Sequence, residues 1–223
     1  MKPQEKSSPL NGLVRDRIQR SIEVHQKLLL DAEFQGLVIE AAMQIVKSLR
    51  AGGKVLFFGN GGSAADAQHL AAEFTGRYLK ERRALPALAL HANSSSITAI
   101  GNDYGFDLVF ARPLEALGNA GDVAVGISTS GNSRNVLGAL EVAKAKSMYT
   151  IALTGASGGA MKKVADCTIR MPTEETPRIQ ECHILTGHMI CEIAEDMLCE
   201  SPEGKAPAPD FAAVTQHQAR GPK

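Results

Sequence analysis

The fold is decided by a strand-to-helix junction that reads Val55-Leu56-Phe57-Phe58-Gly59-Asn60-Gly61-Gly62-Ser63. Residues 55–58 are apolar at every position, which is typical of a strand buried on both faces of a sheet. A glycine-rich turn follows, and a helical pattern then runs from Ser63 to about Tyr78. This order predicts the first strand-and-helix unit of a parallel α/β sheet.

The rest of the chain repeats this alternation. Further apolar runs occupy residues 87–90, 123–127, 149–153 and, more weakly, 167–171. Helical patterns occupy residues 10–30, 32–49 and about 178–199. We therefore predict a three-layer α/β sandwich with a five-stranded parallel sheet and two leading N-terminal helices.

The composition limits the kinds of partner that the protein is expected to bind. The 223 residues are 44% hydrophobic and 22% charged, with 24 basic and 24 acidic side chains. A zero formal charge argues against a nucleic-acid partner, which requires a basic surplus or a basic face. No apolar stretch reaches signal-peptide or membrane-span length, so we expect no membrane partner and a cytoplasmic location.

Two loops have the chemistry of a phosphate site. Residues 59–63 follow the first strand, and Ser128-Thr129-Ser130-Gly131-Asn132-Ser133 follows the run at 123–127. Glycines admit close backbone approach to a ligand, and hydroxyls and helix-start amides suit an anion. Each loop alone could be an ordinary capped turn. The two loops occupy equivalent positions after their strands, which favours a phosphate site. The dinucleotide-binding pattern GxGxxG is absent, because Ala64 stands where its third glycine would be.

At these residues the sequence resembles the phosphoheptose isomerases, a branch of the SIS-domain (sugar isomerase) proteins. The resemblance covers about residues 28–196. It is carried by both loops, by Asp66 and the run from His69 to Tyr78, by residues 101–106, and by Arg178-Ile179-Gln180-Glu181. Several spaced motifs in the right order are more specific than one glycine loop.

The resemblance implies a flavodoxin-like sheet and a homotetramer with sites at subunit interfaces. It implies isomerisation of D-sedoheptulose 7-phosphate to D-glycero-D-manno-heptose 7-phosphate through an enediol, feeding heptose synthesis for bacterial surface glycans such as lipopolysaccharide. Substrate-binding residues would be Asn60, Gly61, Gly62, Ser63, Arg77, Asp103, Ser128, Thr129, Ser130, Ser133 and Gln180.

An aldose–ketose isomerase needs a base for the C–H proton and an acid for the carbonyl oxygen. Glu73 and His188 match the catalytic positions of the family. From spacing alone, Glu73 could instead pair with Arg77 on a solvated helix face, and His188 could be a core histidine. The family match favours the catalytic interpretation of both.

The resemblance also implies one Zn²⁺ per subunit, held by His69, Glu73, Gln180 and His188. The His69/Glu73 pair has good ligand spacing on a helix. Gln180 and His188, however, are separated by roughly 12 Å of continuous helix. Both reach one metal only if Gln180 lies at a frayed helix start or if they come from different subunits. His183 is a rival ligand that we expect to be a packing residue.

Two other functions remain open. A non-catalytic SIS-domain adaptor that binds a replication initiator would share both loops but lack Glu73 and His188. An isomerase of another sugar phosphate would share all of these residues. Pro177 replaces an aspartate found in some family members, so a sugar contact from that position is in doubt.

We expect three segments. They are an N-terminal helical extension at residues 1–35, the SIS domain at 36–200 and a flexible tail at 201–223, which holds several of the ten prolines.

Overall fold

The computed structural model describes residues 9–199. The predicted tail at 201–223 therefore lies outside the described residues. Five parallel strands form one sheet in the order β2-β1-β3-β4-β5. They are β1 (Val55–Gly59), β2 (Ala87–Ala89), β3 (Val123–Ser128), β4 (Tyr149–Thr154) and β5 (Cys167–Arg170). The prediction of a five-stranded parallel sheet is confirmed.

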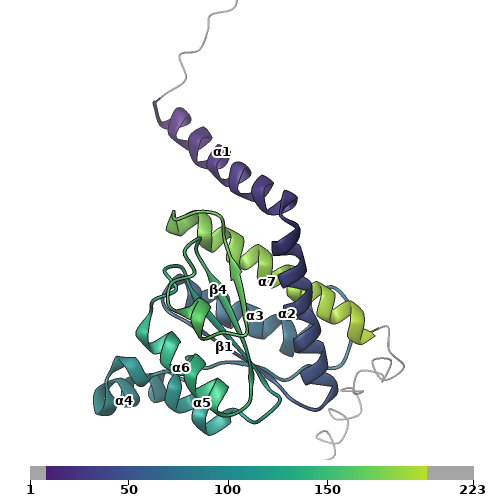
Figure 1. Ribbon diagram of the computed structural model, residues 1–223, viewed down its shortest axis with the longest axis vertical. Coiled ribbons are helices and arrows are strands. Elements are labelled where there is room, and N and C mark those ends of the chain that lie inside the picture. Colours follow the sequence, from purple (N-terminus) through teal and green to yellow (C-terminus); the bar gives the residue numbers. More distant parts are fainter. Residues whose placement is uncertain (1–8, 200–223) are drawn as a thin grey trace, which may run out of the picture.

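Helices cover both faces of this sheet (Figure 1). The helices are α1 (Pro9–Leu30), α2 (Ala32–Arg50), α3 (Gly62–Thr75), α4 (Ser94–Tyr104), α5 (Ala111–Leu117), α6 (Arg134–Ala145) and α7 (Thr176–Cys199), with 3-10 turns η1 (Phe106–Leu108) and η2 (Met161–Lys163). Val55 and Phe57 of β1 pack with α2, α3 and α7, whereas Leu56 and Phe58 pack with α5 and α6. The uninterrupted apolarity of 55–58 thus reflects burial on both faces, and the three-layer prediction is confirmed.

Helix α3 is shorter than its sequence pattern predicted. It ends at Thr75 rather than at Tyr78. The backbone N–H groups of Tyr78, Leu79 and Lys80 donate instead to the carboxylate of Glu195 on α7. A buried acceptor far along the chain therefore competes successfully with the helical hydrogen bonds of the next turn.

Helix α1 extends away from the rest of the chain (Figure 1). Only Val24 and Leu28 of its side chains are buried. Its apolar residues closer to the N-terminus, including Leu13, Val14 and Ile18, are exposed. The predicted boundary at residues 35 and 36 falls inside α2. Across residues 9–199, no helix has the length and apolarity required to cross a membrane.

Candidate active site

The two phosphate-type loops lie side by side. Strands β1 and β3 are neighbours, with Gly59 opposite Ile127 near their carboxyl ends. The chain turns one way from β1 to β2 and the other way from β3 to β4, so the order of strands reverses between β1 and β3. In open parallel sheets ligands bind at this switch point, beyond the carboxyl ends of the strands. The fold therefore places both loops where a ligand is expected.

The first loop leaves the start of α3 open. Gly61 is the N-cap, adopts φ 57°, and has no side chain with which to cap the helix. The first amides of a helix have no intrahelical partner and favour anions. Gly62 lies against the amide of Gln180, so a side chain at position 62 would collide with it. The glycines thus serve both backbone conformation and close packing.

Three hydroxyls of the serine loop gather at the buried Ser128. Ser133 is the N-cap of α6, but its hydroxyl lies 2.9 Å from Ser128 Oγ and does not cap the helix. Ser128 is buried, and Ser130 Oγ is 3.5 Å from it. The carbonyl of Thr129 accepts from Gly155 N–H at 2.9 Å, which fixes the loop to the next strand connection. The loop is a rigid group of hydroxyls beside an uncapped helix start.

Asn135, which the sequence analysis did not nominate, joins the two loops. Its side-chain amide exchanges two hydrogen bonds with that of Asn60, each 2.9 Å long. Asn135 is buried, and its Oδ1 also accepts from Val136 N–H at 2.9 Å. Nothing in the local pattern distinguishes Asn135 from any first-turn helix residue; only the adjacency of β1 and β3 reveals its role.

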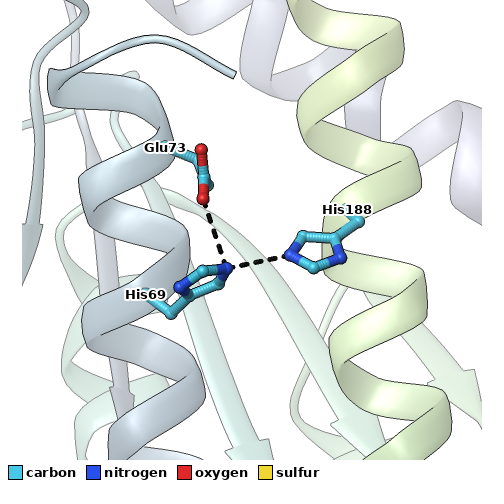
Figure 2. A group of neighbouring side chains, drawn as sticks. All are labelled: His69, Glu73 and His188. Atoms are coloured by element: carbon cyan, nitrogen blue, oxygen red, sulfur yellow. Dashed lines mark hydrogen bonds and ion pairs between the residues drawn. The ribbon is translucent and has the colours of Figure 1, made fainter. Parts of the chain in front are cut away.

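A second cluster lies between α3 and α7 (Figure 2). His69 Nε2 is 3.2 Å from Glu73 Oε1 and 2.9 Å from His188 Nε2. One ligand atom from each of these residues lies within 4.8 Å of the others. The rings of His69 and His188 meet edge to face, and the ring of Tyr78 lies 5.6 Å from that of His188. The structure thus brings the predicted acid–base pair together with His69.

The structure differs from the two specific alternatives, an ion pair of Glu73 with Arg77 and a core position for His188. Arg77 pairs with Glu81 at 3.7 Å, with both side chains exposed, and Glu73 pairs with His69. Arg77 lies beyond the end of α3 at Thr75. His188 is only partly buried and faces His69, so it is no core histidine.

Comparisons with known proteins identify the family of this chain. The SIS domain family matches residues 23–155. A phosphoheptose isomerase from Rhodospirillum rubrum is 59% identical over 162 residues, which are 73% of this chain and 86% of that protein. Another, from Aneurinibacillus thermoaerophilus, is 47% identical over 189 residues, 85% of this chain and 96% of that protein. The chain belongs to the phosphoheptose isomerase family of SIS-domain proteins.

A solved phosphoheptose isomerase from Neisseria gonorrhoeae has the same fold. Its TM-score is 0.77 at 45% identity, and the match covers 83% of this chain and 99% of that one. Recognition of the family, of its fold and of an isomerase from sequence is therefore confirmed.

Within one chain, three of the four predicted Zn²⁺ ligands lie together, and Gln180 does not. His69, Glu73 and His188 offer two imidazole nitrogens and a carboxylate oxygen, a donor set that suits Zn²⁺ with an open position. Gln180 lies in the second turn of a continuous α7 and faces Gly62, so the frayed-start possibility is wrong. His183 is fully buried, and burial lowers its pKa to about 4. His183 does not belong to the cluster of His69, Glu73 and His188, and its role as a packing residue stays a prediction.

Two further acidic residues, Asp103 and Asp66, belong to the motifs that carry the family resemblance. Asp103 lies exposed in the last turn of α4 and accepts from Asn102 at 2.8 Å. It lines a cavity of about 620 Å³ to which none of the other predicted site residues contributes. Asp66, by contrast, lies one turn before His69, and its Oδ2 is buried without a hydrogen-bond partner among the described residues. Burial raises the pKa of Asp66, and the charge of His69 opposes that shift.

Proposed function

We propose that this protein isomerises D-sedoheptulose 7-phosphate to D-glycero-D-manno-heptose 7-phosphate. The observation that carries the proposal is the contact of Glu73, His69 and His188 between α3 and α7, in a chain whose fold and relatives are those of phosphoheptose isomerases. An adaptor would need neither a carboxylate nor an imidazole at this place. The product then supplies heptose units for bacterial surface glycans.

The proposed site residues fall into two groups, one that binds the substrate and one that transfers protons. The uncapped starts of α3 and α6, with the hydroxyls of Ser63, Ser128, Thr129, Ser130 and Ser133, hold the phosphate. Asn60, Gly61, Gly62, Arg77, Asp103 and Gln180 are the remaining proposed substrate contacts. Because these contacts are the same for ketose and aldose, they position the substrate and leave the chemistry to other groups.

Proton transfer is assigned to Glu73 and His188. Glu73 takes the proton from C1 of the ketose while His188 donates a proton to the C2 carbonyl oxygen, which gives the enediol. The protonated Glu73 then returns a proton to C2, and His188 accepts the proton of the C1 hydroxyl, so that both groups regain their starting states. Glu73 is half-buried and His188 is held by two aromatic neighbours, which suits groups that must keep a fixed geometry.

We propose Zn²⁺ as the metal, with His69, Glu73 and His188 as ligands from one chain and Gln180 from a neighbouring subunit. When bound, the metal would polarise the carbonyl oxygen, on which negative charge develops as the C1 proton leaves. Gln180 is eight residues before His188, or roughly 12 Å along α7, which is why its contribution requires a second subunit.

A homotetramer with sites at subunit interfaces is the proposed assembly. The apolar face of α1 is exposed over Leu13, Val14 and Ile18, and a helix with such a stripe needs a partner. A groove of about 480 Å³ between α1, α2 and α7 is lined by Leu29, Leu185 and other apolar side chains. Glu73 lies ten residues after Ser63, about 15 Å along α3, so loops and acid–base pair from different subunits would complete one site.

The experiment is to incubate the purified protein with sedoheptulose 7-phosphate and to follow aldose formation. We expect turnover by the parent protein and large losses in Glu73→Gln and His188→Ala. Glu81→Gln is a matched control, since it removes an exposed carboxylate of the segment that follows α3. Absence of turnover in the parent would favour the adaptor, and a faster reaction with a shorter sugar phosphate would favour a different isomerase. Undiminished turnover in both variants would overturn the mechanism.

A further inference from the structure

The most deeply buried ion pair of residues 9–199 joins Arg82 to Glu195, outside the groups assigned to catalysis so far. Arg82 Nε lies 2.8 Å from Glu195 Oε1, and the side chains are 3% and 1% exposed. Burying two charges is costly unless every donor and acceptor finds a partner. The partners that these two side chains do find are informative.

Arg82 caps the end of the helix that carries Glu73. Its guanidinium donates to the carbonyls of Glu73 at 2.7 Å, Phe74 at 3.0 Å and Gly76 at 3.2 Å. The last carbonyls of a helix have no intrahelical partner, and a cation there is favourable. One of these carbonyls belongs to Glu73 itself, so Arg82 fixes the backbone from which the proposed base projects.

Glu195 holds the segment after α3 in place from α7. It lies two turns after His188, and its carboxylate accepts from the N–H groups of Tyr78, Leu79 and Lys80 at 3.0, 2.6 and 2.7 Å. Burial acts to raise the pKa of Glu195, but these donors and Arg82 outweigh it and lower the pKa, so the group stays ionised. The segment held in this way includes Tyr78, whose ring lies 5.6 Å from that of His188.

We propose that the Arg82–Glu195 pair is a positioning device for proton transfer, which holds Glu73 on α3 and His188 on α7 at their working separation. Arg82 acts on the backbone of Glu73, and Glu195 acts on His188 through Tyr78. The catalytic part of this inference rests on the proposed isomerase function. Because a misplacement of about 1 Å in an active site can cost about a hundredfold in rate, a displaced helix end would be visible in kcat.

The test compares Glu195→Gln and Arg82→Lys with a matched control, Asp196→Asn. The control breaks an exposed ion pair, 2.8 Å long, between Lys80 and Asp196, which also joins this segment to α7. Glu195→Gln keeps the shape of the side chain but removes its charge. Arg82→Lys keeps the charge facing Glu195 but loses the fork that reaches four carbonyls, those of Glu73, Phe74, Gly76 and Arg83. It is the gentler change if Glu195→Gln does not fold.

Two readouts separate positioning from simple stability, both taken at a temperature where circular dichroism shows a folded protein. The first is kcat and KM, for which we expect kcat to fall at least tenfold with KM nearly unchanged, because the phosphate loops are untouched. The second is the ring-proton resonance of His188 in the substrate-free protein, assigned with His188→Gln. It should move in Glu195→Gln and Arg82→Lys as the Tyr78 ring shifts, and should stay in place in Asp196→Asn.

A folded variant with unchanged kcat and an unchanged His188 resonance would overturn the proposal, since the pair would then serve stability alone. Equal effects in Asp196→Asn would also overturn it. If the parent protein does not turn over sedoheptulose 7-phosphate, the proposed function fails, and the His188 resonance still decides whether the pair positions that ring.

Discussion

The first and the last turn of α3 carry different halves of the candidate site, and they are built differently. The first turn relies on backbone amides and on glycines at positions 61 and 62. The last turn relies on the carboxylate of Glu73, which contacts His69, and His69 in turn contacts His188 from α7. The first turn joins a second loop, because β1 and β3 are neighbours and Asn60 bonds to Asn135. The second cluster exists because two distant helices pack together. The proposed binding half thus depends on the junction of two strands, and the proposed chemical half on the junction of two helices.

The largest effect is expected at the last turn of α3. Glu73→Gln retains the size of the side chain but removes the base, and general-base catalysis contributes about 10²–10⁴-fold. We expect kcat to fall about a thousandfold while KM changes less than threefold. Steady-state kinetics with sedoheptulose 7-phosphate measure both constants. A change confined to KM would move Glu73 from the chemical to the binding half of the site.

The buried His183 of α7 predicts a pH effect on stability. Burial lowers the pKa of His183 from 6.5 to about 4. Between these values the unfolded chain binds a proton that the folded chain does not, so the free energy of unfolding falls as the pH drops from 6.5 towards 4. At 1.36 kcal/mol for each pKa unit, the loss is about 3 kcal/mol. Urea unfolding at pH 7 and pH 4 measures it.

The control for this stability effect is His183→Leu, which has no group to titrate at that position. Its free energy of unfolding should depend less on pH than that of the parent by the same amount. An identical pH dependence in the two proteins would show that His183 is not held neutral by its surroundings.

A smaller effect is expected at the phosphate loops. Ser128→Ala removes one buried hydroxyl from a group that binds through several contacts, and a hydrogen bond to a charged group is worth about 1.5–3 kcal/mol. We expect KM to rise by about ten- to a hundredfold, with kcat nearly constant. Ser157→Ala, in an exposed turn, is the control. A loss in kcat alone would contradict the division between binding and chemistry.

The smallest effect is expected for the exposed pair of Arg77 and Glu81. Such pairs contribute about 0–1 kcal/mol, so Glu81→Gln should change the free energy of unfolding by less than about 0.5 kcal/mol. Turnover should stay within twofold of the parent. A large loss of activity in Glu81→Gln would mean that Arg77 and its partner act on Glu73 after all.

The strands could be predicted from the sequence because burial on both faces leaves an uninterrupted apolar run, as at Val55 to Phe58. The two candidate phosphate loops could be located because each directly follows a buried strand. Their equivalent positions, rather than their glycines and serines alone, favoured a phosphate over an ordinary capped turn. The end of α3 could not, because Glu195 lies more than a hundred residues away and captures the N–H groups of its next turn. No pattern in the residues around the end of α3 indicates that a carboxylate of α7 accepts these hydrogen bonds.

The same distinction explains the side chains. Glu73 and His188 were nominated through a family resemblance, because their spacing alone favoured an ion pair with Arg77 and a core histidine. Asn135, Arg82 and Glu195 were missed, since each acts through a partner that only the folded chain brings near. The role of Gln180 could not be predicted for a different reason. Its position on α7 is fixed by the fold, but whether it would reach the metal of a neighbouring subunit depends on how the chains assemble.

The most direct test of the account is to run the reaction in deuterium oxide with the parent protein and with Glu73→Gln. The proton that Glu73 takes from C1 exchanges with solvent deuterium before it is returned to C2. The parent is therefore expected to form the aldose with solvent deuterium at C2, seen by NMR, and Glu73→Gln to form it about a thousandfold more slowly. Aldose free of deuterium, formed equally fast by both proteins, would contradict the assignment of Glu73 as the base that joins the two halves of the site.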